Sequence, residues 1–170
     1  GTSIMFVGQR KNGRLNFEAR ALSECVIAEN SEGEVDTVYR CYEMTVRQVM
    51  QEAESDSEWK PSDKVKALFS AQKYDEKVKI IHGVYPRSMR DFAKEQPGPD
   101  EMAFSSCYFE YDTDHKLKES GFPEFPYLCP RWSKYPGELY RRSPGMTALP
   151  DVKMLQAKEQ SGGKPLPPEA

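Results

Sequence analysis

The sequence predicts an α+β fold, with a twisted antiparallel β-sheet built from hairpins and two or three short helices. Three observations lead to this prediction. Short stretches before residue 45 alternate apolar and polar side chains, as half-buried strands do, and turn-forming residues separate them. The apolar spacing then changes to a helical period at Thr45. Strand-like stretches return from Lys77 onward and are again joined by turn residues.

Two hairpins are predicted at the start of the chain. Asn and Gly tolerate the positive φ that a tight hairpin turn demands, and both occur between the first two apolar stretches. The next two stretches flank an insert rich in turn-forming residues. The strands and turns are residues 3–7 and 15–19 around Asn12 and Gly13, then residues 25–28 and 35–42 around residues 29–33.

Two short helices are predicted in the middle of the chain. Thr45 and Gln48 fit a capping box, in which each side chain accepts a hydrogen bond from a backbone N–H that the first helical turn leaves unpaired. A second helix is expected after Pro61 and Ser62. The apolar residues that share one face of these helices are Val46, Val49, Met50 and Ala53 in the first, and Val65, Leu68 and Phe69 in the second.

The second half of the chain returns to strands before a last helix. A strand over residues 77–85 should end at Pro86, which cannot donate to a central ladder, and a loop is expected up to Glu101. Ser143 and Pro144 can open a helix, because proline is favoured in the first turn. The remaining expected segments are a hairpin of residues 104–111 and 116–119 around residues 112–115, an extended run over residues 123–132, and a broken helical apolar pattern towards Lys158.

The expected organisation is one domain over residues 1–156 and an irregular Gly/Pro-rich tail over residues 157–170. Because the chain opens at Gly1 without an initiator Met, we expect the domain to come from a longer protein. No stretch approaches the roughly 20 apolar residues that a membrane span needs, so no membrane association is expected. Four cysteines without close spacing are interpreted as reduced thiols.

Motifs for catalysis, metals and nucleotides are absent from the sequence. The two histidines are expected at a half-buried strand position (His82) and in an exposed turn (His115), away from any nucleophile pattern. No ligand set has zinc or calcium spacing, and no Gly-rich phosphate loop occurs. We therefore predict no enzyme activity, no metal and no cofactor.

The 24 basic and 27 acidic residues give a net charge of −3, which offers no overall basic surface for a nucleic-acid backbone. One stretch, residues 131–142, combines basic and aromatic residues and could contact single-stranded nucleic acid. The alternative is a strand and turn whose guanidinium groups pair with neighbouring carboxylates. A protein interface is a further hypothesis, because Trp, Tyr and Arg carry much of the binding energy at interfaces. The residues of this predicted subunit interface are Arg131, Trp132, Tyr140 and Arg142.

The same part of the chain closely resembles the bacteriophage head-to-tail connector (portal) family of short-tailed phages. The segments that carry the resemblance are residues 119–127 (ESGFPEFPY), 130–134 (PRWSK), 137–138, 140–144 and 148–155 (ALPDVKML), preceded by residues 22–24, 27–30, 33–40, 45–48 and 82–87. Two features depart from the family. Arg141 stands where a glycine is usual, and Gly162 and Gly163 follow where the family continues into a long stem helix.

The resemblance implies a fragment of the portal wing, in a structural subunit of the ring through which DNA is packaged and ejected. It implies a closed cyclic ring of about a dozen copies, located in the virion and assembled in the bacterial host cytoplasm. The implied partners are other copies of the subunit, terminase, capsid or scaffold protein, and tail adaptor proteins, with DNA passing through the channel without sequence-specific binding. The alternatives are another phage tail or adaptor protein and a single-stranded nucleic-acid-binding module.

Overall fold

The computed structural model describes residues 1–9, 13–88, 98, 101–133, 137–140, 142–160 and 162 of the 170-residue chain. It divides into two compact units, one formed by Ile4–Leu128 and the other by Gly1–Ser3 with Cys129–Ala170. The division falls inside the range 1–156, for which the sequence predicted one domain. No helix in the described part of the chain is long and apolar enough to cross a membrane.

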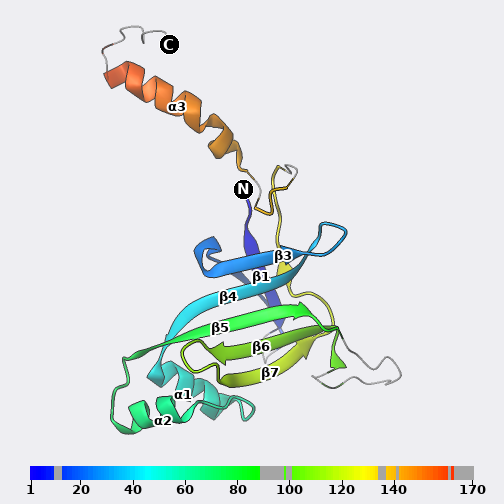
Figure 1. Cartoon of the computed structure of the whole chain (residues 1–170), viewed down its shortest axis with the longest axis vertical. Coiled ribbons are helices and arrows are strands. Elements are labelled where there is room, and N and C mark those ends of the chain that lie inside the picture. Colours follow the sequence, from blue (N-terminus) through cyan, green and yellow to red (C-terminus); the bar gives the residue numbers. More distant parts are fainter. Residues whose placement is uncertain are drawn as a thin grey trace. The chain divides into compact units, whose positions relative to one another are not determined.

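The strands of unit Ile4–Leu128 form two antiparallel sheets, shown in Figure 1. The small sheet has the order β2-β1-β8 and the large sheet the order β3-β4-β5-β6-β7. The α+β prediction is confirmed, but the predicted strands divide between two sheets because β1 pairs with β8 and not with β3. The strands are β1 (Ile4–Gln9), β2 (Leu15–Arg20), β3 (Cys25–Glu29), β4 (Val35–Thr45), β5 (Lys77–Pro86), β6 (Phe104–Glu110), β7 (Lys116–Phe122) and β8 (Tyr127–Leu128).

Both predicted N-terminal hairpins are present. β1 and β2 pair from Ile4 with Arg20 to Gln9 with Leu15, and Gly13 in their turn has a φ of 80°. Its predicted turn partner, Asn12, lies outside the described residues. In the β3–β4 turn the Asn30 side chain accepts hydrogen bonds from the backbone N–H groups of Glu32 and Glu34, and Gly33 takes a φ of 77°. Local turn chemistry therefore sets the register of both hairpins.

Capping residues start both helices that follow β4. The Thr45 hydroxyl accepts from the N–H of Gln48 at 3.3 Å, and the Gln48 side chain accepts from the N–H of Thr45 at 2.8 Å, which confirms the capping box. Ser62 caps the second helix by accepting from the N–H of Val65. The helices of the structure are α1 (Val46–Ser55), α2 (Asp63–Ser70) and α3 (Pro144–Gln160), with a short 3-10 turn, η1 (Leu22–Glu24), that the sequence did not predict.

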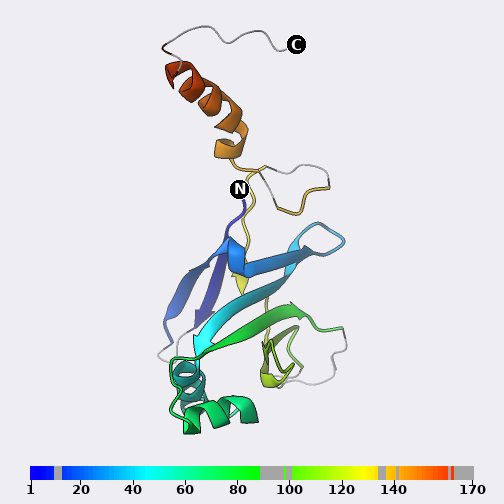
Figure 2. The same cartoon turned by 60° about the vertical axis from the view of Figure 1, so that its left-hand side comes forward.

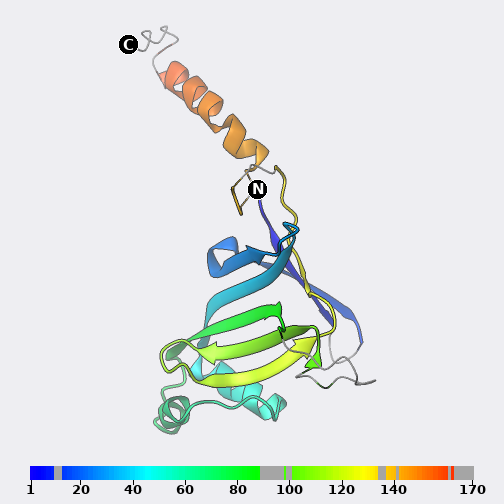
Figure 3. The same cartoon turned by 45° about the vertical axis from the view of Figure 1, so that its right-hand side comes forward.

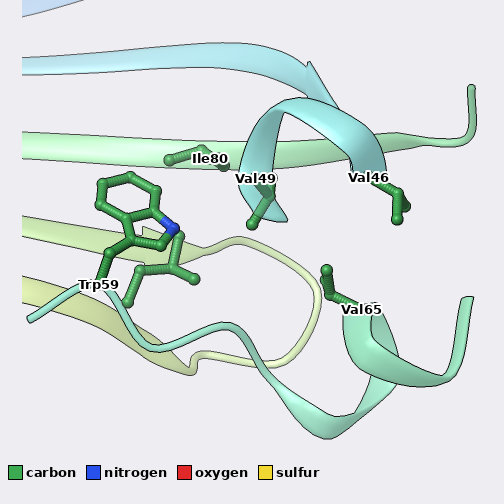
Figure 4. Packing of buried hydrophobic residues seen from close by; sticks show 6 residues of the cluster. Val46, Val49, Trp59, Val65 and Ile80 are labelled. Atoms are coloured by element: carbon green, nitrogen blue, oxygen red, sulfur yellow. The ribbon is translucent and has the colours of Figure 1, made fainter. Parts of the chain in front are cut away.

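Helices α1 and α2 cover one end of the large sheet with an apolar core. The predicted apolar residues of both helices lie in this core or pack against it. Figure 4 shows Val46, Val49 and Val65 of the helices together with Ile80 of β5. Trp59, in the connection between the helices, fills the space beside them and lies 5.0 Å from the ring of Tyr108. The buried members of the cluster are Val46, Val49, Trp59, Val65, Ile80 and Leu117.

The small sheet covers the other end of the same face of the large sheet. Phe6 of β1 makes edge contacts with the rings of Phe122 in β7 and Tyr127 in β8, and Ile4 is buried beside them. Figures 2 and 3 show the β1–β2 hairpin on this side of the large sheet. The large sheet thus has an inner face, covered by helices and by the small sheet, and an outer face.

His82 lies on the inner face of β5 and is more deeply buried than the predicted half-buried strand position. Its ring stacks on Tyr108 with the centroids 3.9 Å apart, and its Nε2 is 2.9 Å from the hydroxyl oxygen of Ser106. Burial lowers the pKa of His82 to about 3, and the charges of Arg20 and Arg40 act in the same direction. The imidazole is therefore neutral in the folded protein at neutral pH.

This buried histidine predicts a loss of stability in mild acid. The folded-state pKa lies below the unfolded value of about 6.5, so below that pH the unfolded chain binds a proton that the folded chain excludes. As the pH falls from about 8 to about 4.5, protonation of His82 in the unfolded chain should lower the free energy of unfolding by about 2–3 kcal/mol. Urea unfolding across this range should show the loss in the native protein, whereas a His82→Phe variant should lose less. Equal pH slopes for the two proteins would contradict the assignment.

Candidate interaction surface

Two of the predicted interface residues, Arg131 and Trp132, lie on an extended segment that pairs with the first residues of the chain. The N–H of Trp132 donates to the carbonyl of Gly1 at 3.0 Å, and the N–H of Ser3 donates to the carbonyl of Pro130 at 3.2 Å. Thr2 and Arg131 face each other in an antiparallel bridge. Backbone hydrogen bonds therefore fix this segment without using the side chain of Trp132.

The side chain of Trp132 is the most exposed large apolar group among the described residues, with 73% of its surface accessible. Tyr140 is 39% exposed, and Arg131 is half-buried. The indole of Trp132 thus stabilises the isolated chain very little. A large exposed aromatic ring of this kind makes a favourable contribution to the free energy only when another surface covers it.

Arg142 is positioned by contacts within its own segment. It forms an antiparallel bridge with Ser133, the residue after Trp132. Its guanidinium donates two hydrogen bonds to the Glu138 carboxylate, at 2.7 and 3.2 Å. This pairing agrees with the alternative interpretation, in which the guanidinium groups of the stretch pair with neighbouring carboxylates. Arg141 and residues 134–136 of the same stretch lie outside the described residues.

Helix α3 follows directly and adds exposed apolar side chains. It begins as predicted, with Pro144 as its first residue and the Ser143 hydroxyl accepting from the N–H of Met146 at 3.1 Å. None of its residues is buried, and its apolar side chains point in several directions. It extends through Gln160, so residues 157–160 of the expected irregular tail are helical, and residues 163–170 lie outside the described residues. The exposed apolar residues of α3 are Met146, Leu149, Val152, Met154 and Leu155.

The histidine and cysteine side chains in the described part of the chain make contacts that support the fold. His115 in the β6–β7 turn is half-buried, in contrast to the predicted exposed position, and its Nε2 donates to the Lys60 carbonyl at 2.9 Å. None of the four cysteines, all of which lie among the described residues, forms a disulfide, and Cys25 and Cys107 are buried. Among the described residues, no group of three or more His, Cys, Asp or Glu side chains is placed to hold a metal ion.

An α+β domain that exposes a tryptophan, a tyrosine and an apolar helix has the surface of a protein that functions in contact with other proteins. Comparison with known proteins identifies the family of this chain. The family model described as "Bacteriophage head to tail connecting protein" matches residues 1–164. This chain belongs to that family.

Two relatives are similar over most of the chain. It is 39% identical over 138 residues to a probable portal protein of Bordetella phage BPP-1, and 35% identical over 163 residues to the portal protein of Salmonella phage epsilon15. These matches cover 80% and 94% of this chain but only 24% and 28% of the relatives. The chain therefore spans about a quarter of the length of these relatives.

Replacing each of the two tryptophans of the chain by alanine should have a very different effect on stability. Trp59 is 7% exposed and Trp132 is 73% exposed. Trp59→Ala should lower the free energy of unfolding by about 3–5 kcal/mol, because it leaves a cavity in the core. Trp132→Ala should change it by less than about 0.5 kcal/mol, as expected for an exposed side chain. Urea unfolding followed by far-UV circular dichroism measures both. A large loss in Trp132→Ala would show that its ring is covered within the chain.

Proposed function

We propose that this chain forms part of a structural subunit of the phage portal, the ring that connects head to tail and through which DNA is packaged and ejected. The observation that carries the proposal is the similarity to a portal protein over 94% of the chain. The exposed tryptophan and the uncovered helix support an assembly role. This role requires neither a cofactor nor a catalytic residue. It would place the protein in the virion after assembly in the host cytoplasm.

Residues Arg131, Trp132, Tyr140 and Arg142 are proposed to contact a neighbouring subunit. Trp132 would contribute the most to the binding free energy, because its ring is exposed in the single chain and would become buried at an interface. Glu138 holds the guanidinium of Arg142 in a fixed plane through two hydrogen bonds. A guanidinium that is already ordered loses less conformational entropy when a partner binds.

Helix α3 is proposed to be covered by other copies in the ring. Isolated helices of this length are marginal in water, and most helical stability in proteins comes from tertiary packing. The described residues of α3 obtain none of that packing from their own chain, and Pro150 and Gly145 weaken the helix further. In a ring of about a dozen copies, the same heterologous contact repeats until the ring closes.

Further partners of the ring are proposed to be terminase, capsid or scaffold protein, and tail adaptor proteins. DNA would pass through the channel without sequence-specific binding. The net charge of −3 supports this, because a channel through which DNA moves should not hold the phosphate backbone with many basic side chains.

Electron microscopy tests the proposal directly. The full-length product of the gene that encodes this chain should form rings with a central hole in negative stain. Well-folded monomers under all conditions of salt and concentration would overturn the portal assignment and favour another tail or adaptor protein.

The proposed interface predicts that Trp132→Ala lowers ring yield in the full-length protein without unfolding the domain. Trp132→Phe should retain part of the ring yield, because an aromatic ring can still fill the contact. Particle counts in negative stain give the yield, and circular dichroism confirms folding. Ring yield equal to that of the native protein in Trp132→Ala would exclude the indole from the interface.

A further inference from the structure

The small sheet has an apolar outer face that no described residue covers. Met5 in β1 faces Ala19 in β2 and Leu128 in β8, so these residues lie on one side of the sheet. Leu15 is 66% exposed and Phe17 is 58% exposed on the same side. We call this the small-sheet outer face, and it consists of Met5, Val7, Leu15, Phe17, Ala19 and Leu128.

The large sheet has a second apolar outer face. Val26 in β3 is paired with Tyr39 in β4, and they are 61% and 43% exposed. The Tyr39 ring stacks against Tyr85, above the buried Gly83, where a Cβ would lie 2.7 Å from the Tyr39 ring. Glycine is therefore needed for this ring to lie flat on the sheet. We call this the large-sheet outer face, and it consists of Val26, Tyr39, Cys41, Ile81, Tyr85 and Phe109.

The two outer faces belong to one two-layer arrangement. Successive side chains of a strand point to opposite faces of its sheet. The inner faces of the two sheets contact each other through Phe6 of β1 and Phe122 of β7. The outer faces therefore point away from one another. One unit thus offers two different apolar surfaces on its two sides, which is the arrangement that a heterologous, head-to-tail contact requires.

The turns beside the two faces carry opposite charge. Residues 10–14, which join β1 to β2, contain three basic residues and no acidic residue in the sequence, and the described member, Arg14, is exposed. Residues 29–36, around the β3–β4 turn, contain Glu29, Glu32, Glu34 and Asp36 and no basic residue. Complementary charges of this kind favour contact between the two faces and disfavour contact of either face with itself.

We propose that the small-sheet outer face of one copy of this chain packs on the β3–β4 part of the large-sheet outer face of the next copy. Each face has about six residues, far fewer than the roughly 20–30 per side of a stable two-protein interface. The contact therefore suits neighbours that other contacts, such as those of α3, also hold together. This inference rests on the proposed ring and specifies which surfaces meet in it.

Photo-crosslinking of assembled full-length protein tests the contact. Phe17 is replaced by p-benzoylphenylalanine, which keeps an aromatic ring at this position. After irradiation, mass spectrometry identifies the peptide attached to residue 17. The expected product joins two copies through residues 25–41. Tyr74, which is 39% exposed and lies between α2 and β5, outside both faces, serves as the control position and should give no product with residues 25–41.

The outcomes separate the two proposals. Rings that yield the expected crosslink support the contact. Rings in which residue 17 attaches to another region, or to no second copy, overturn the contact but leave the portal proposal intact. Absence of rings in the unlabelled protein overturns the portal proposal itself.

Charge exchange gives an independent measurement of the same contact. Arg14→Glu alone, and Glu32→Lys with Glu34→Lys, should each lower ring yield at low salt. Combining the three substitutions should recover part of the yield, because the new acid at position 14 then faces new bases at positions 32 and 34. Failure of the combined variant to recover, with all variants folded by circular dichroism, would contradict the pairing of these two turns.

Discussion

A three-stranded sheet with a two-residue edge strand is marginal in water, so the small sheet depends on apolar contact with the large one. Phe6 of β1 contributes to this contact through the ring of Phe122 in β7. The large sheet in turn has its inner face covered at both ends, by the small sheet and by the helices. Mutual burial of the inner faces decides which residues remain outside. The surfaces available to partners are thus a consequence of the core.

Two buried polar side chains, Glu110 and His82, are paired, as a low-dielectric interior favours. Glu110 is 2% exposed and accepts hydrogen bonds from the N–H of Ser62 and the hydroxyl of Thr113. It therefore ties the end of β6 to the start of α2, where the helix dipole favours a negative charge. His82 is similarly held by Ser106. The contact of Glu110 with Ser62 fixes the position of α2 on the sheet more specifically than apolar contact alone.

Local features of the fold were predictable from sequence because their causes are local. Hairpin turns follow from Gly13 and Asn30, helix starts from Thr45 and Ser143, and apolar helix faces from spacing. The division into two sheets was not predictable, since the β1–β8 pair joins residues about 120 positions apart. The candidate surface was predicted by residue type alone. The exposure of Trp132 does not follow from composition, because it depends on which segment pairs with residues 1–3. The pairing of Arg142 with Glu138 is local and agrees with the sequence alternative in which guanidinium groups pair with neighbouring carboxylates.

The β1–β8 pairing also has a consequence for the order of folding. Each strand of the large sheet pairs with its neighbour in the sequence, so that sheet can grow by successive hairpins. The small sheet closes only when Met5 meets Leu128, and contacts of such long sequence separation form slowly. A newly made chain should therefore complete its large sheet before its small one. An incompletely folded chain would then lack the small-sheet outer face on which the proposed contact between copies depends.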